Sequence, residues 1–285
     1  MSRSSGKLPV TVVGIAGGTS VGKTTMMLMA TAELIARSKD KQATMIAEID
    51  TGDQRIAFDR EMQRLATGMT VAPTSGSVPD AFILRVERQK SRSLLYLYDA
   101  PGEEFSHIDT FSQHQWLQRA DGLMLLVDPA PLPGFIAKTG GLPNPEVQAS
   151  KTPLNDVVNS CIAGAEKMMA RRSSEGLSVP LAVVITKADL EAVKRRVGDL
   201  SIGISDGAAC RSALWEWGAG GAMQTIEKRF SNVRYFACSA LGRTPSEKNT
   251  SPFSSYGVLN PLLWILKGTD LPKATNQRRA GREGT

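Results

Sequence analysis

The sequence predicts an α/β protein with a mostly parallel sheet, and three features of the chain support this fold class. Short apolar runs recur along the chain, each typical of a buried strand, and helical segments separate them. A glycine-rich turn, GGTSVGKT at residues 17–24, joins the first apolar run to the first helical segment. Short polar motifs follow several later runs, where parallel strands end at a common edge.

The order of these segments gives the expected elements. Residues 81–88 alternate apolar and charged side chains, as in a half-exposed edge strand, and we expect a hairpin with the apolar run 94–98. Thr152 and Asn260 are the expected N-caps of two helices. The expected strands are residues 10–15, 44–49, 81–88, 94–98, 122–127, 181–185 and 233–237. The expected helices run from the glycine turn to about residue 37 and over residues 53–68, 112–120, 153–172, 190–196 and 260–268.

The composition is that of an ordinary globular protein. The chain has 285 residues, of which 41% are hydrophobic. Its three cysteines lack the spacing of a disulfide framework or a zinc site. No apolar run is long enough to span a bilayer, and the first residues contain no signal core, so we expect a cytoplasmic protein without membrane insertion.

The net charge of +6 does not indicate a nucleic-acid partner, because much of the excess lies near the two ends. Residues 1–9 and 268–285 are polar and basic, and we expect both segments to be disordered. A single domain is therefore expected over residues 10–267. Its expected insertions lie at about residues 38–68, 129–150 and 191–230.

The turn GGTSVGKT has the composition of a phosphate-binding loop. Gly17 and Gly22 permit the backbone conformations that turn successive N–H groups inward, and the following helix adds its positive dipole end. Lys23 would reach the terminal phosphates, and the Thr24 hydroxyl would coordinate Mg²⁺. The expected phosphate-binding residues are Gly17, Gly18, Thr19, Ser20, Val21, Gly22, Lys23, Thr24 and Thr25.

A second motif, DAPG at residues 99–102, follows the apolar run 94–98. An aspartate at this strand end can meet the same Mg²⁺ through water, and Gly102 can bring its N–H to a γ-phosphate. Such a turn also ends strands for purely structural reasons. Its position downstream of the lysine turn favours the role of Asp99 at the metal.

The motif TKAD at residues 186–189 follows the apolar run 181–185. The Asp189 carboxylate can accept hydrogen bonds from the N1–H and 2-amino groups of guanine, while the aliphatic stem of Lys187 lies along the purine. Asp189 as a helix N-cap is an equal alternative. After the last strand, Ser239 and Ala240 could contact the base carbonyl.

Together, these four motifs resemble those of the P-loop GTPases of the Ras-like, translation-factor-related class. The resemblance implies a three-layer Ras-like P-loop fold, mostly parallel with one antiparallel edge strand, plus helical insertions. It also implies GTP or GDP and Mg²⁺ as ligands. The extra strand and helix near residues 38–68 and the sequence DAPGEEF at 99–105 are similar to the bacterial double-GTPase group, whose members are associated with defence systems.

The resemblance implies further residue roles. A second Mg²⁺-binding threonine would come from residues 68–80, with Thr74 preferred and Thr70 as the alternative. The metal set is then Thr24, Thr74 and Asp99. The guanine-binding set is Thr186, Lys187, Asp189, Ser239 and Ala240. The catalytic set is Lys23, Thr74, Gly102 and Glu103.

Glu103 departs from the pattern of the resembled class, in which a glutamine at this position often orients the attacking water. A carboxylate is repelled by a γ-phosphate, so we expect slow unaided hydrolysis, with Glu103 as a catalytic base as the alternative. Neither His107 nor His114 directly follows Gly102, and we expect both histidines to be surface or packing residues.

Different functions remain open at this stage. The first is a GTP-hydrolysing switch that regulates a protein partner by ordering residues 68–80 and 102–110. The second is a GTP-bound scaffold with little turnover. An ATP-dependent kinase or motor is a third possibility, which Asp189 disfavours.

Overall fold

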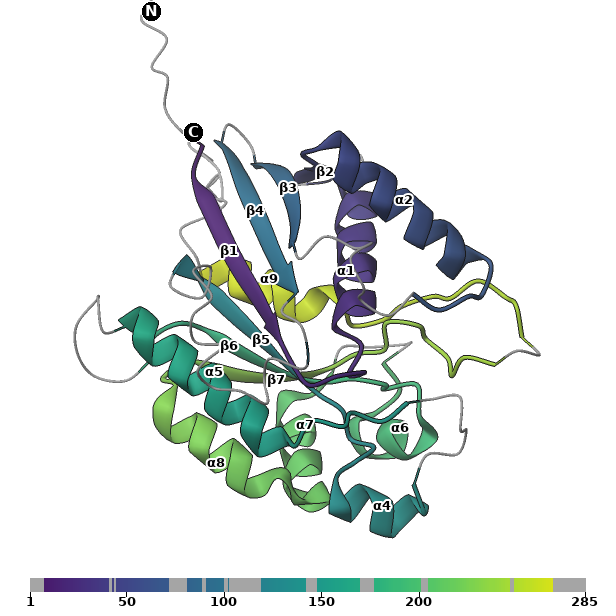
Figure 1. Ribbon diagram of the computed structural model, residues 1–285, viewed down its shortest axis with the longest axis vertical. Helices are drawn as coiled ribbons and strands as arrows, with labels where there is room; N and C mark the ends of the chain where they lie inside the picture. The colour runs from purple at the N-terminus through teal and green to yellow at the C-terminus, as the bar shows by residue number, and fades with distance from the viewer. Residues whose placement is uncertain are drawn as a thin grey trace, which may run out of the picture.

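The protein is built around one seven-stranded sheet (Figure 1). The computed structural model describes residues 8–40, 43, 45–71, 81–88, 91–99, 102, 119–141, 148–169, 177–200, 205–246 and 249–268. The strands are β1 (Val10–Ala16), β2 (Ile46–Ile49), β3 (Ala81–Arg88), β4 (Ser91–Asp99), β5 (Gly122–Val127), β6 (Leu181–Ile185) and β7 (Val233–Ala237). The helices are α1 (Lys23–Ser38), α2 (Gly52–Ala66), α4 (Pro133–Thr139), α5 (Leu154–Met169), α6 (Glu191–Val197), α7 (Gly207–Leu214), the π-helix η3 (Trp215–Ala219), α8 (Gly220–Arg229) and α9 (Leu259–Gly268).

The strand order is β2-β3-β4-β1-β5-β6-β7. The pairs β4 with β1, β1 with β5, β5 with β6 and β6 with β7 are all parallel, whereas β3 runs antiparallel to both of its neighbours. The α/β P-loop fold class and the expected hairpin are therefore confirmed. The expectation that residues 81–88 form an edge strand is wrong, because β3 lies between β2 and β4 and β2 is the outermost strand. Side-chain alternation reports which faces are buried and not which backbone edges are paired, so it does not reveal this position.

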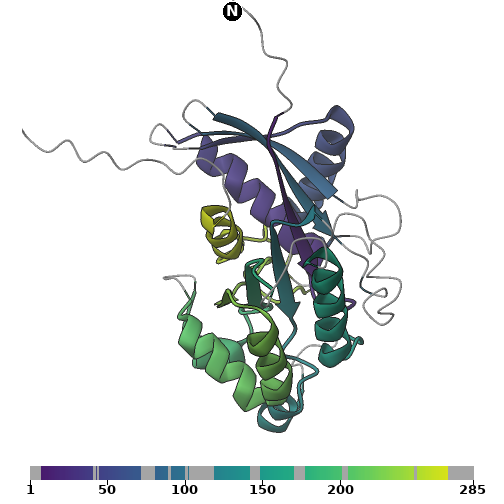
Figure 2. The same cartoon turned by 90° about the vertical axis from the view of Figure 1, so that its left-hand side faces the viewer.

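Helices cover both faces of the sheet, which explains why the central strands are apolar throughout. Every residue of β5 and β6 is buried, as expected of parallel strands enclosed on both sides. Alternate residues of β5 point into different cores: Leu125 packs with α5, α7 and α8, whereas Leu126 packs with α1 and α9. Figure 2 shows α9 (yellow) and α5 (teal) on opposite sides of the sheet.

One of the expected insertions contains more regular structure than the sequence indicates. The proline-rich stretch 129–150, expected to be irregular, contains α4, which begins with Pro133. Gly134 in α4 permits close packing against η3, because a Cβ at this position would lie 2.5 Å from the Glu216 carbonyl oxygen. The rings of Phe135 and Trp217 meet edge to face, with centroids 5.4 Å apart. Two of the expected insertions therefore pack together on the α5 side of the sheet.

Helix boundaries differ from the expected ones at the caps. The Pro153 carbonyl accepts the first hydrogen bonds of α5, from the backbone N–H groups of Asp156 and Val157, so Pro153 occupies the cap position expected for Thr152. α9 begins at Leu259, so Asn260, the expected N-cap, lies inside the helix. Most of the expected helix 112–120 lies outside the described residues. In the described part of the chain, no helix is long and apolar enough to cross a membrane.

Candidate functional site

The four motifs lie at neighbouring strand ends. The glycine turn follows β1, Asp99 ends β4, TKAD follows β6 and Ser239 comes shortly after β7. Because β4, β1, β5, β6 and β7 are consecutive and parallel in the sheet, their carboxyl ends share one edge. The topology thus brings these segments, far apart in sequence, to one side of the protein.

The glycine turn is folded around the ammonium of Lys23. Lys23 is the first residue of α1 and is 8% exposed as a whole residue. Its ammonium donates hydrogen bonds of 2.9 Å to the carbonyl oxygens of both Gly17 and Gly18. Gly22 (φ 95°) caps α1 in the left-handed region. Gly22 makes no side-chain cap hydrogen bond to α1, and the first N–H groups of a helix are the ones that can bind an anion.

The predicted metal-binding residues of α1 and β4 are in contact. The Thr24 hydroxyl donates a 2.5 Å hydrogen bond to Asp99 Oδ2. The β1–β4 pairing sets this contact, since it places Asp99 opposite Ile15 at the end of β1. Asp99 is 6% exposed. Hard oxygen donors of this kind suit Mg²⁺.

Gly102 lies directly against the glycine turn. A Cβ at Gly102 would come within 2.7 Å of both the Cα and the backbone nitrogen of Thr19. The absence of a side chain therefore permits the approach of the DAPG turn. Thr74 and Glu103 lie outside the described residues, as do both histidines. Thr70 is exposed, and its carbonyl oxygen accepts a hydrogen bond from Arg64.

The carboxylate of Asp189 is held through both of its oxygens. Ser239 Oγ donates a 2.6 Å hydrogen bond to Oδ1, and Thr244 Oγ1 donates a 3.3 Å bond to Oδ2. Ser239 is itself fixed by the backbone N–H of Gly242 at 2.8 Å. Leu190, not Asp189, is the N-cap of α6. Thr244 was missed by sequence reasoning, because it lies in a segment without periodicity.

The other predicted base-binding residues have different environments. The Thr186 hydroxyl donates to the Val127 carbonyl oxygen at 3.3 Å and ties β6 to β5, and Ala240 is half-buried. Burial raises the pKa of the Cys238 thiol, and the nearby Asp189 carboxylate raises this pKa further. The pKa of Tyr256 is raised by the same causes. Both groups therefore stay neutral around Asp189 at physiological pH.

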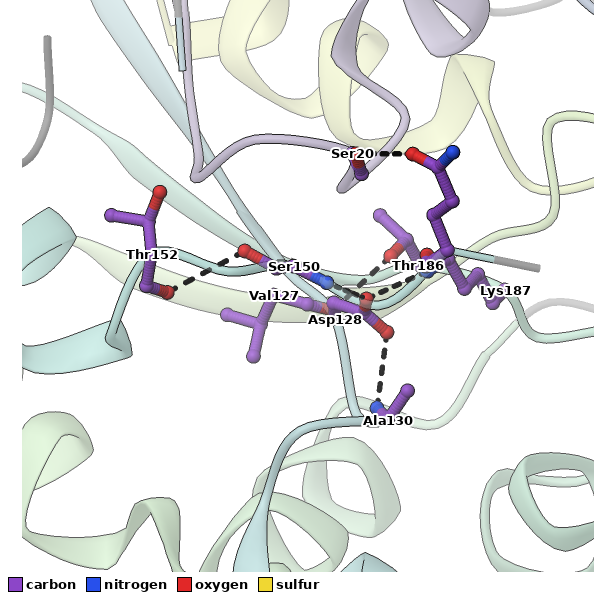
Figure 3. Close-up of polar contacts among 9 residues, drawn as sticks. Ser20, Val127, Asp128, Ala130, Ser150, Thr152, Thr186 and Lys187 are labelled. Atoms are coloured by element: carbon purple, nitrogen blue, oxygen red, sulfur yellow. Dashed lines mark hydrogen bonds and ion pairs between the residues drawn. The ribbon is translucent and has the colours of Figure 1, made fainter. Parts of the chain in front are cut away.

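Lys187 is anchored by a buried carboxylate that the sequence reasoning did not single out (Figure 3). Its backbone is left-handed (φ 55°), and its ammonium donates 2.6 Å hydrogen bonds to Asp128 Oδ2 and to the Gln148 carbonyl oxygen. The Gln148 side chain accepts a hydrogen bond of 3.2 Å from the Ser20 hydroxyl in the glycine turn. The available sequence signal for Asp128 is its place immediately after the buried strand β5.

Comparison with known families identifies the family of the chain. A family model described as Double-GTPase 2 matches residues 11–209, well over half of the chain. The match includes the glycine turn, Asp99, Gly102 and Asp189, whereas Ser239 and Thr244 lie beyond it. Comparison with curated proteins gives no match. The sheet topology agrees with a P-loop fold. The chain therefore belongs to the Double-GTPase 2 family.

Proposed function

We propose that the protein binds GTP with Mg²⁺, hydrolyses it slowly, and acts as a switch that regulates a protein partner. The observation that carries this proposal is the arrangement of Lys23, Asp99 and Asp189 at the ends of parallel strands of one sheet. Family membership supports guanine nucleotides as the ligand class. In this proposal one triphosphate spans the edge, with its phosphates in the glycine turn and its base at Asp189.

Lys23 and the N–H groups of the turn would bind the β- and γ-phosphates. Thr24 would hold Mg²⁺ directly and Asp99 through water, with Thr74 or Thr70 supplying a further hydroxyl. The contact between Thr24 and Asp99 supports this assignment because both donors are hard oxygens at 2.5 Å from one another. When bound, the ion would neutralise charge on the phosphates.

Asp189 would select guanine over adenine. Ser239 and Thr244 each donate to one of the two carboxylate oxygens, and each oxygen has a further lone pair with which to accept from the base. Guanine offers N1–H and a 2-amino group to this pair of acceptors, whereas adenine offers no matching donors. Lys187 would lie along the purine face with its ammonium already bound to Asp128.

The backbone N–H of Gly102 would bind the γ-phosphate, since the Gly102 backbone lies beside Thr19 in the glycine turn. Displacement of Gly102 would move the residues that follow it, which is how GTPase switches commonly respond to hydrolysis. We further propose that the partner belongs to a bacterial defence system, as the double-GTPase group suggests. Co-purification of the tagged protein with its neighbouring gene products in GTP and in GDP tests this part.

The hydrolysis proposal is tested by phosphate release over hours, measured together with the nucleotide content of the purified protein. We expect a single-turnover rate constant of about 10⁻⁴ s⁻¹, the range of unaided GTPases of this type. Retained GTP without phosphate release would instead support a GTP-bound scaffold. Equal affinities for GTP and ATP would contradict the guanine assignment.

Glu103 gives a prediction about mechanism. We expect Glu103→Ala to change the single-turnover rate less than threefold or so, because a carboxylate lacks the donor and acceptor pair with which a glutamine orients water. The measurement is hydrolysis with enzyme in excess over GTP. A loss of many-fold would assign Glu103 as a catalytic base and reject the expected bystander role.

Gly102→Ala is expected to reduce GTP hydrolysis while leaving GDP binding nearly unchanged. The added methyl group would lie 2.7 Å from the backbone of Thr19, so the DAPG turn must move away, and we expect hydrolysis to fall about tenfold while GDP affinity changes little. Gly52→Ala is the matched control, because a Cβ at Gly52 has no atom within 4 Å. Normal hydrolysis by Gly102→Ala would argue against the sensing role.

A further inference from the structure

Asp128 occupies a central position among the strand ends. It follows β5 directly, and β5 lies between β1, which leads into the glycine turn, and β6, which leads into TKAD. A carboxylate at this point lies between the part of the site that would hold phosphate and the part that would hold the base. Neither the family match nor the four sequence motifs assigns a role to this residue.

The Asp128 carboxylate is almost completely buried and well bonded. Its side chain is 1% exposed. Oδ1 accepts a 3.0 Å hydrogen bond from the Ala130 N–H, while Oδ2 accepts one of 2.8 Å from the Ser150 N–H and one of 2.6 Å from Lys187 Nζ (Figure 3). A buried charge is tolerated only with such partners. The ion pair with Lys187 is therefore built into the fold.

The segment 148–152 connects this ion pair to the glycine turn. At one end, the Gln148 carbonyl oxygen accepts from Lys187 Nζ at 2.6 Å and its side chain accepts from Ser20 at 3.2 Å. At the other end, Thr152 Oγ1 accepts a 3.2 Å hydrogen bond from the Thr19 N–H. Asp128 holds the middle of the segment through Ser150, so one carboxylate links the turn and Lys187.

We propose that Asp128 is a positioning residue for nucleotide binding. It fixes the long side chain of Lys187 before the nucleotide arrives, so that binding the base does not have to restrict the rotamers of a free lysine. The same side chain accepts from the Ser150 N–H in segment 148–152, and an asparagine oxygen at residue 128 can keep this contact to a neutral donor. This inference rests on the proposed function, in which Lys187 lies against guanine.

Asp128→Asn tests the inference. We expect the Kd for GDP to rise about tenfold or more, the usual effect of losing a charge-assisted hydrogen bond, while the Kd for inorganic triphosphate stays within about twofold. A purely structural defect would weaken both ligands alike. Glu227→Gln is the matched control, because Glu227 of α8 also pairs with a basic residue, Arg211 of α7, but follows none of the strand ends that form the site. This variant should bind GDP normally.

Lys187→Met breaks the same ion pair from its more exposed end and keeps the apolar stem. The Lys187 side chain is 16% exposed and the Asp128 side chain 1%, so we expect a substitution at Lys187 to disturb the fold less. Lys187→Met therefore tests the ion pair even if Asp128→Asn does not fold. We expect Lys187→Met to match Asp128→Asn in its loss of GDP affinity. In the double variant the two losses should not multiply, since both act through one contact.

The outcomes separate this inference from the proposed function. Equal losses for GDP and inorganic triphosphate, or losses that multiply in the double variant, would overturn the positioning role. Normal GDP binding by Lys187→Met would also overturn it, provided that Asp189→Asn weakens GDP. If neither Lys187→Met nor Asp189→Asn weakens GDP, the guanine site itself is wrong and the proposed function fails.

Discussion

Lys23→Ala is expected to reduce the affinity for both GTP and GDP on the order of 100-fold or more, because several charge-assisted hydrogen bonds to phosphate are lost together. Lys23 is 8% exposed, and its ammonium donates hydrogen bonds of 2.9 Å to the Gly17 and Gly18 carbonyl oxygens. Lys23 therefore also supports the shape of the glycine turn. Titration with a fluorescent GDP analogue measures the effect.

Lys228→Ala is the control for this experiment, since Lys228 is an exposed lysine on α8. It should bind GDP as the natural sequence does. Circular dichroism and thermal unfolding of Lys23→Ala would establish that the sheet remains folded. Tight GDP binding by a folded Lys23→Ala protein would remove the glycine turn from the proposed nucleotide site.

Asp189→Asn is expected to change the base that the protein prefers. The variant should lose about 100-fold or more in GDP affinity, because two hydrogen bonds to a charged, half-buried acceptor are disrupted. Xanthosine diphosphate should bind better than GDP, since the asparagine amide can donate to the 2-oxo group of xanthine. Competition among the two nucleotides and ADP measures the preference.

The hydrogen-bond partners of Asp189 can also accommodate an asparagine. The asparagine oxygen can still accept from Ser239, and the Thr244 hydroxyl can rotate to accept from the new amide, so the fold should survive. Glu191→Gln removes a nearby exposed carboxylate that pairs with Arg195 and should leave the preference unchanged. An Asp189→Asn protein that still prefers GDP would exclude Asp189 from base recognition.

Much of the sheet and the outline of the site could be predicted from the sequence, since both depend on strong local patterns. Buried parallel strands give uninterrupted apolar runs, as in β5 and β6. The glycine turn and DAPG each follow such a run, so their meeting follows from the parallel pairing of β1 and β4. The contact between Thr24 and Asp99 is a direct consequence.

The rest of the site depends on contacts that local patterns do not report. Thr152 reads as a helix cap, but its hydroxyl bonds to Thr19 in the glycine turn instead. Thr244 reaches Asp189 from an irregular segment after β7. Asp128 looks like an ordinary loop aspartate until β5 is placed between β1 and β6. Each depends on tertiary placement, which the spacing of residues along the chain does not encode.

The position of β2 limits how another protein could join the sheet. An outermost strand offers its free backbone groups to an incoming chain, and β2 offers only Ile46–Ile49, with Ile46 53% exposed. The intervening strand β3 separates β2 from β4, which carries Asp99. We therefore expect a protein that pairs with β2 to be separated from the proposed nucleotide site. Its binding would then not depend on whether GTP or GDP is bound. State-dependent recruitment would then require the loops at the strand ends.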